Sequence, residues 1–195
     1  MSLLARRAVL RRGCYGRGMP SDAFVEKLTE QVGHEFSASQ QYVAVAVYYD
    51  DEALPRLASF FYAQAIEERN HAMMMVRYLL DADAPVRVPG VGAPKSGFAN
   101  LVEPVRIALE QERKVSDQIA ALSGLAREEG DYQSEQFLQW FLKEQVEEVA
   151  TMSDLLRVVE RGSENPLMVE EYLVREGVGS EAPDATAPPV AGGAI

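Results

Sequence analysis

The chain has 195 residues, of which 47% are hydrophobic, and a formal net charge of −11. This composition supplies the core of one domain, excludes wholesale disorder, and argues against general nucleic-acid binding while suiting a protein that handles cations. The single cysteine, Cys14, rules out an intrachain disulfide, so a reducing, cytoplasmic compartment is the expectation. Only two histidines, His34 and His71, are present, which excludes a histidine-rich site. No apolar run reaches the ~20 residues of a membrane-spanning helix.

Residues 1–18 contain five arginines and no acidic residue. The pair Arg6-Arg7 would fit a twin-arginine export signal, but only residues 8–10 are apolar before two further arginines, which is too short for such a signal. A basic arm that contacts DNA is the functional alternative. We interpret the segment as a disordered extension, or as the product of a start codon upstream of a true start at Met19.

Five helices are predicted within an expected domain of residues 19–176, and their approximate bounds are residues 21–51, 54–83, 101–129, 131–161 and 165–176. Ser21 is an N-cap candidate for the first helix, Gly130 ends the third, and Pro166 occupies a first helical position. A Gly/Pro-rich connection spans residues 84–96. Residues 177–195 are small residues and prolines, which predict a disordered tail.

The lengths of the connections predict how the helices are arranged. Short connections within the first and second helix pairs favour antiparallel hairpins, whereas the long connection requires the crossover of an up-down-down-up bundle. The predicted fold is therefore all-α, a four-helix bundle with a long crossover between helices two and three and a short fifth helix. Glu170 on that fifth helix is expected at the surface.

Apolar residues recur along every long helix in alternating steps of four and three, which is the pattern of bundle packing. Polar side chains interrupt each of these seams near its midpoint, namely Glu35, Glu68 and His71, Glu112, and Gln145 and Glu148. Because packed helices of similar length share one midpoint level, these side chains are expected to converge at one depth in the core.

Carboxylates at that depth are costly, because one uncompensated buried charge costs several kcal/mol and like charges raise one another's pKa. No basic residue stands on any seam, so the pattern favours an external cation held between the helices. Two alternatives stay open: neutral carboxyls that share protons, and a partly hydrated seam whose register is misassigned.

The donor types indicate which metal would bind. Oxygen donors with one imidazole suit iron or manganese better than zinc. Glu68 and His71 are three residues apart and project from one side of their helix. Glutamates from two helices, with Glu-x-x-His from the other two, form di-iron sites in bundle cores. The first three helices meet this pattern, whereas the fourth carries Gln145-Val-Glu-Glu148 instead of a second Glu-x-x-His.

From about Phe24 through the fifth helix the chain resembles bacterial non-haem ferritins, and so predicts a ferritin-like bundle. The segments HEFSASQQYVAVAVYY, AIEERNHAMMMVRYLL, ALEQERKVSDQI and FLQWFLKEQVEEVA carry the resemblance. The resemblance implies an Fe(II)-oxidation centre formed by Glu35, Glu68, His71, Glu112, Gln145 and Glu148. It also implies that Tyr42 assists oxidation, and that an additional iron site is formed by Glu67, Glu144, Glu147 and Glu148.

The resemblance further implies iron storage, in which O2 or hydrogen peroxide oxidises Fe(II) at a di-iron centre and ferric mineral is deposited in a 24-subunit cage. Asp131 and Glu135, which open the fourth helix, are candidates for acidic entry pores, and helix capping with dipole pairing is the alternative for both. Haem is not expected, because Arg69 stands where bacterioferritins place a haem-ligating methionine. Neither a membrane nor DNA is an expected partner.

Two related functions stay open from the sequence. A di-iron oxidase or peroxide-reducing enzyme would use the same bundle but normally carries two Glu-x-x-His motifs. A DNA-protecting mini-ferritin would lack the fifth helix and place its site between subunits. The size of the purified protein separates these classes, because a large cage excludes most monomeric or dimeric oxygenases.

Overall fold

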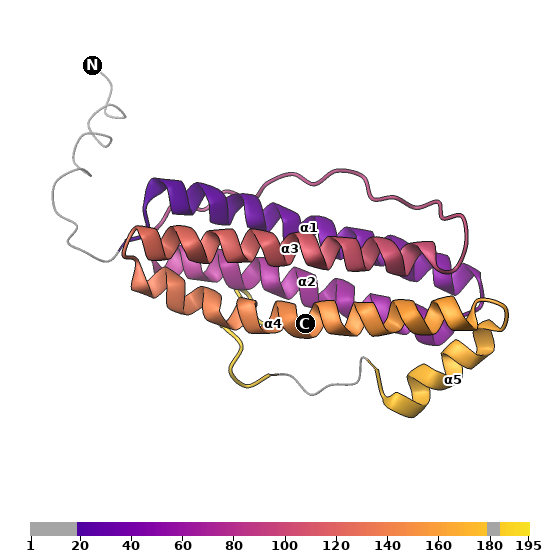
Figure 1. Ribbon diagram of the computed structural model, residues 1–195. Helices are drawn as coiled ribbons and strands as arrows, with labels where there is room; N and C mark the ends of the chain where they lie inside the picture. The colour runs from indigo at the N-terminus through magenta and orange to yellow at the C-terminus, as the bar shows by residue number, and fades with distance from the viewer. Residues whose placement is uncertain (1–18, 179–183) are drawn as a thin grey trace, which may run out of the picture.

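The computed structural model describes residues 19–178 and 184–195, so the arginine-rich segment 1–18 and the expectations attached to it lie outside the described residues. The described part of the chain contains no strand and five helices (Figure 1), which are α1 Asp22–Asp51, α2 Pro55–Asp81, α3 Glu103–Glu128, α4 Tyr132–Gly162 and α5 Pro166–Glu176. The predicted all-α class and helix order are confirmed. None of these helices is long and apolar enough to cross a bilayer.

Local signals account for where the helices begin. The Ser21 side chain accepts a hydrogen bond at 3.0 Å from an amide in the first turn of α1. The Asp131 carboxylate accepts one at 3.1 Å from an amide of α4, so each satisfies an otherwise unpaired N–H. The α3 helix begins at Glu103, slightly later than predicted, because the Asn100 side chain accepts from two backbone amides and holds the chain in a turn before the helix.

The four long helices form two antiparallel hairpins, α1 with α2 and α3 with α4, and residues 82–102 run along the bundle to join them (Figure 1). Apolar side chains form two buried clusters. One contains Tyr42, Phe61 and Met152, and the other contains Leu28 and Phe141. On each long helix the polar residues of the seam fall between these two clusters, so the bundle has a polar layer at its middle. Burial of each large apolar side chain contributes about 1.5–3 kcal/mol, which stabilises the helices on both sides of that layer.

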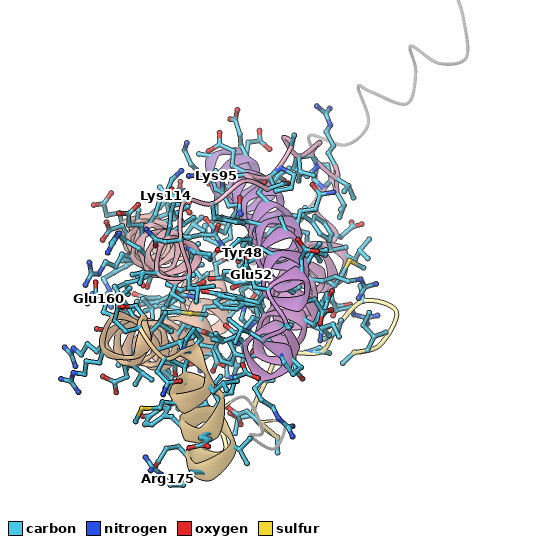
Figure 2. All side chains as sticks on the ribbon, turned by 90° about the vertical axis from the view of Figure 1, so that its right-hand side faces the viewer. Tyr48, Glu52, Lys95, Lys114, Glu160 and Arg175 are labelled. Carbon is cyan, nitrogen blue, oxygen red and sulfur yellow. The ribbon has the colours of Figure 1, made fainter. Side chains whose placement is uncertain are left out.

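Helix α5 lies across the end of the bundle and projects away from it, with Arg175 at its outer end (Figure 2). Its Val169 packs on the first cluster, where Gly162 leaves room that a Cβ would fill. The Glu170 carboxylate accepts hydrogen bonds from the amides of Arg56 and Leu57 at 2.8 and 3.0 Å. The expectation of a surface position for Glu170 was therefore wrong: it is buried, and it caps the first turn of α2, where a negative charge is favourable.

Residues 184–195, in the C-terminal part of the predicted tail, lie against α2 and α4. The Asp184 carboxylate accepts a hydrogen bond from Nε1 of Trp140 at 3.1 Å and lies 3.5 Å from Nζ of Lys143. The Ala191 amide donates to the carbonyl oxygen of Met73 at 3.1 Å. The composition of residues 184–195 cannot build a core, but Ala187, Val190 and Ala191 pack against the second cluster, so these residues contact a surface that the bundle itself forms.

Candidate metal centre

The polar layer collects carboxylates from all four long helices. Glu35 comes from α1, Glu68 from α2, Glu112 from α3 and Glu148 from α4, and none is more than 6% exposed. His71 follows Glu68 by one helical turn and is 2% exposed. Each residue occupies a core-facing step of its helix between the two apolar clusters. The structure thus brings together the side chains that the seam pattern expected at one depth.

Three of these side chains could share one ion. Glu35, Glu68 and His71 each place a ligand atom within 4.8 Å of the other two. Nδ1 of His71 lies 3.4 Å from Oε2 of Glu68. The imidazole packs edge-on against Trp140 and Phe141, with ring centroids 5.5 and 5.8 Å away. These aromatic contacts restrict the ring, so the imidazole is presented to the carboxylates in one orientation.

Four carboxylate oxygens in the layer are buried without a hydrogen-bond partner: Oε2 of Glu35, both oxygens of Glu68, and Oε2 of Glu112. Among the described residues, no lysine or arginine forms an ion pair with these three side chains. Unpaired buried carboxylate oxygens are costly. Oxygen donors with a single imidazole suit iron better than zinc, whose structural sites are usually closed by thiolates or histidines. The residues present therefore fit a divalent cation such as Fe(II).

Burial changes the protonation of these groups. It raises the pKa of the Glu68 carboxyl well above its ordinary value, and neighbouring carboxylates raise that pKa further. Burial also raises the pKa of Glu112 to about 7, although hydrogen bonds from Tyr42 and Gln145 act in the opposite direction. The pKa of Glu148 is raised for the same main reason. In the absence of cations the layer therefore holds protons near neutral pH, and a bound cation takes their place.

Tyr42 lies directly beside this group. Its side chain is fully buried, and its hydroxyl donates a hydrogen bond to the Glu112 carboxylate. Its ring packs against Phe61 with centroids 5.6 Å apart. Burial and the charge of Glu112 raise the pKa of the Tyr42 phenol well above its ordinary value. Tyr42 therefore stays protonated and acts as a hydrogen-bond donor.

A second group of donors adjoins the first. Glu67, His71 and Glu144 place ligand atoms within 4.8 Å of one another, so His71 belongs to both groups. Burial raises the pKa of Glu144 to about 7, and the charge of Glu67 contributes to the increase. Glu147, which was predicted to join them, has a side chain that is 55% exposed and lies 3.5 Å from Nζ of Lys143.

Two buried glutamines in this region had no predicted role. Nε2 of Gln31 donates to Oε1 of Glu35 at 2.9 Å, and Nε2 of Gln64 donates to Oε2 of Glu67 at 2.7 Å. For Gln31 the sequence did indicate the contact, because Gln31 precedes Glu35 by one turn on the same helix face. The two amides hold carboxylates in place without supplying a positive charge.

Asp131 and Glu135 make contacts within the chain. The Asp131 carboxylate accepts hydrogen bonds from the amide and hydroxyl of Ser134 at 3.1 and 2.5 Å. Oε1 of Glu135 lies 2.7 Å from Nη2 of Arg127. These contacts agree with the capping alternative. A role in a pore involves other copies of the chain and stays a prediction.

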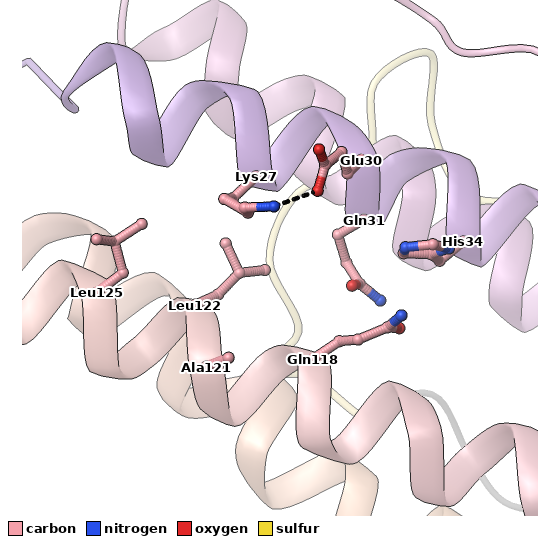
Figure 3. A pocket seen from close by; sticks show the side chains of 8 residues that line it. All are labelled: Lys27, Glu30, Gln31, His34, Gln118, Ala121, Leu122 and Leu125. Atoms are coloured by element: carbon pink, nitrogen blue, oxygen red, sulfur yellow. Dashed lines mark hydrogen bonds and ion pairs between the residues drawn. The ribbon is translucent and has the colours of Figure 1, made fainter.

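The second histidine lies outside the polar layer. His34 lines a groove of about 430 Å³ between α1 and α3, together with the ion pair of Lys27 and Glu30 (Figure 3). Gln31 also lines this groove and donates to Glu35, so this amide connects the wall of the groove to one of the buried carboxylates. Because His34 belongs to neither group of metal-binding donors, it serves as a matched control for substitutions of His71.

Known proteins share this architecture. Residues 25–162 match the ferritin family, described as a ferritin-like domain. Ferritin BfrB of Mycolicibacterium smegmatis is 50% identical over 168 residues, which cover 86% of this chain and 92% of that protein. The bacterial non-heme ferritin of Staphylococcus aureus is 40% identical over 132 residues, covering 68% and 80%. An open-pore ferritin from the archaeon Archaeoglobus fulgidus has a TM-score of 0.76 at 26% identity, covering 83% and 98%. With its bundle and its carboxylate layer, the chain belongs to the ferritin family.

Proposed function

We propose that this protein oxidises Fe(II) to Fe(III) in the polar layer of the bundle and stores the ferric product inside a cage of its own copies. The observation that carries the proposal is the set of buried carboxylate oxygens without partners, placed around the single imidazole of His71. Membership of the ferritin family and the names of the relatives support iron as the substrate.

The substrate is a pair of Fe(II) ions, each of which gives up one electron. With O2 as oxidant, two Fe(II), one O2 and two protons yield two Fe(III) and one H2O2. His71 fixes one iron ion, and Glu112 with Gln145 lies beside the second. Because Coulomb attraction grows with ionic charge, the carboxylates stabilise Fe(III) more than Fe(II) and favour oxidation. Tyr42 donates to Glu112 and keeps that carboxylate oriented.

The second group of donors supplies a route out of the layer. The charges of Glu67 and Glu112 both raise the pKa of Glu148, so Glu148 lies near both groups. We propose that ferric ions pass from the layer by way of Glu148 to Glu67 and Glu144, which form the additional iron site. Glu147 would join this site by exchanging its contact with Lys143 for a metal ion.

Exposed apolar residues support assembly into a cage. On α5, Leu167, Met168 and Val174 are 66%, 62% and 58% exposed. Apolar side chains gathered on one short helix are stabilised by contact with further copies of the chain. Truncation after Arg161 would remove this helix while leaving the ligands, so we expect a soluble subunit that assembles poorly and retains little mineral.

Rapid mixing of the metal-free protein with Fe(II) and O2 tests the proposal. His71→Ala and Glu68→Gln should each lose most of the fast oxidation phase, and Gln145→Ala should lose less because the amide is a neutral, weaker ligand. His34→Ala, at the other histidine, should oxidise Fe(II) as the wild type does. Wild-type rates in the combined His71→Ala and Glu68→Gln variant would end the proposal.

A further inference from the structure

The hydroxyl of Ser116, on α3, lies between two acceptors. Its Oγ is 2.8 Å from the carbonyl oxygen of Glu112, one turn earlier on the same helix, and 3.0 Å from Oε1 of Gln145 on α4. A serine hydroxyl has one proton to donate and two lone pairs that accept. Ser116 can therefore donate to only one of these two oxygens at a time.

The arrangement in the structure turns the oxygen of Gln145 away from the carboxylates. Oε1 of Gln145 accepts from the Ser116 hydroxyl, and the other end of the amide lies close enough to the Glu112 carboxyl to lower its pKa. Gln145 is 4% exposed, so its amide lies in a buried environment where an unpaired polar group is costly. In this orientation the amide oxygen of Gln145 faces Ser116 and not the carboxylate layer.

The same hydroxyl also supports the opposite orientation. When Ser116 donates to the carbonyl oxygen of Glu112, its lone pair can accept from Nε2 of Gln145, and Oε1 then faces the carboxylate layer. Both orientations leave the buried amide paired on the side of Ser116. An alanine at this position would cost more in the second orientation, where it leaves a buried N–H without an acceptor, than in the first, where a carbonyl oxygen loses one donor.

We propose that Ser116 is a positioning residue that lets the Gln145 amide turn from a hydrogen-bond donor to Glu112 in the metal-free protein into an oxygen ligand of the second cation. The inference rests on the proposed function, since it assumes that two cations bind in the polar layer. It assigns two orientations to the Gln145 amide, and the structure shows the one in which Oε1 faces Ser116.

Anaerobic titration of the assembled, metal-free protein with Co(II), followed by calorimetry and by Co(II) absorption, tests the inference without any oxidation. The wild type should bind two Co(II) per subunit in the polar layer, in two steps. Ser116→Ala should weaken the second step about twofold to fivefold, which reflects the difference between these two costs, and leave the first unchanged. Ser116→Thr, which keeps the hydroxyl, should restore it.

Ser37→Ala is the matched control, because the Ser37 hydroxyl donates to the Gly33 carbonyl at 2.8 Å on α1 and has no glutamine partner. This variant should change neither step. In a Gln145→Ala background, Ser116→Ala should cause no further loss, because the partner it positions is absent.

Each alternative outcome has a distinct meaning. Unchanged binding in Ser116→Ala, or equal weakening of both steps, would overturn the inference about Ser116 alone. Further loss on adding Ser116→Ala to Gln145→Ala would do the same. A wild type that binds no pair of Co(II) would overturn the proposed function, and this inference with it.

Discussion

Replacing Glu112 by glutamine should stabilise the metal-free protein. Burial raises the pKa of Glu112 from 4.5 to about 7. A carboxyl whose folded-state pKa exceeds its unfolded value destabilises the fold as pH rises between the two values. Each pKa unit corresponds to about 1.36 kcal/mol, so the ionised group costs the metal-free fold about 3 kcal/mol above pH 7. Glutamine removes that charge and still offers Tyr42 an oxygen to donate to.

The gain in stability from Glu112→Gln should depend on pH. Below pH 4.5 the carboxyl is protonated in both states, so Glu112→Gln should change stability little. The gain should grow between pH 4.5 and 7 and level off above. Thermal melting of the metal-free protein at several pH values measures it, with about 5–10 °C expected at pH 8 for a chain of this size.

Glu110→Gln is the matched control, because Glu110 is an exposed glutamate on the same helix. It should melt as the wild type does at every pH. With divalent cations bound the order should reverse, since the wild type is then stabilised by its ligand. A metal-free Glu112→Gln protein that melts below the wild type at pH 8 would refute the reasoning, as would a gain that does not vary with pH.

Three further predictions concern the periphery. Glu170→Ala should cost about 1 kcal/mol in urea denaturation, because its carboxylate caps two amides of α2, whereas the exposed neighbour Glu171→Ala should cost little. Asp184→Ala should release Trp140, the only tryptophan, and red-shift its fluorescence; an unchanged spectrum would contradict the docking of the tail. Deleting residues 1–18 should leave cage size and Fe(II) oxidation unchanged, and loss of the cage or of DNA retention in a gel shift would reveal a functional arm.

The arrangement of the polar layer could be predicted because it depends on helix periodicity and helix length alone. Glu35, Glu68 and Glu112 each stand on an apolar seam, and similar helix lengths bring their midpoints to one level. Even Gln145 and Glu148 follow from the same count along α4. This step needs no knowledge of loop conformation, so the apolar seams alone were enough to predict which side chains form the polar layer.

Contacts between elements with no shared periodicity could not be predicted. Glu170 has the pattern of a surface residue on α5, and it is buried because that helix folds back on the first turn of α2. The tail was predicted to be disordered from its small residues and prolines, and that composition says nothing about the second cluster, against which Ala187 and Val190 pack. Ser116 lies next to Gln145 only after α3 and α4 have packed.

The neutral neighbours of the polar layer explain how it remains ready for a cation. A lysine or arginine in the core would pair with the carboxylates and compete with iron for them. Gln31 and Tyr42 instead donate one hydrogen bond each, to Glu35 and Glu112, and these contacts orient the carboxylates while leaving other oxygens unpaired. When these carboxyls ionise, the metal-free fold therefore carries an electrostatic strain that the apolar clusters on both sides offset. Because binding a cation relieves this strain, part of the affinity for iron comes from the instability of the empty layer.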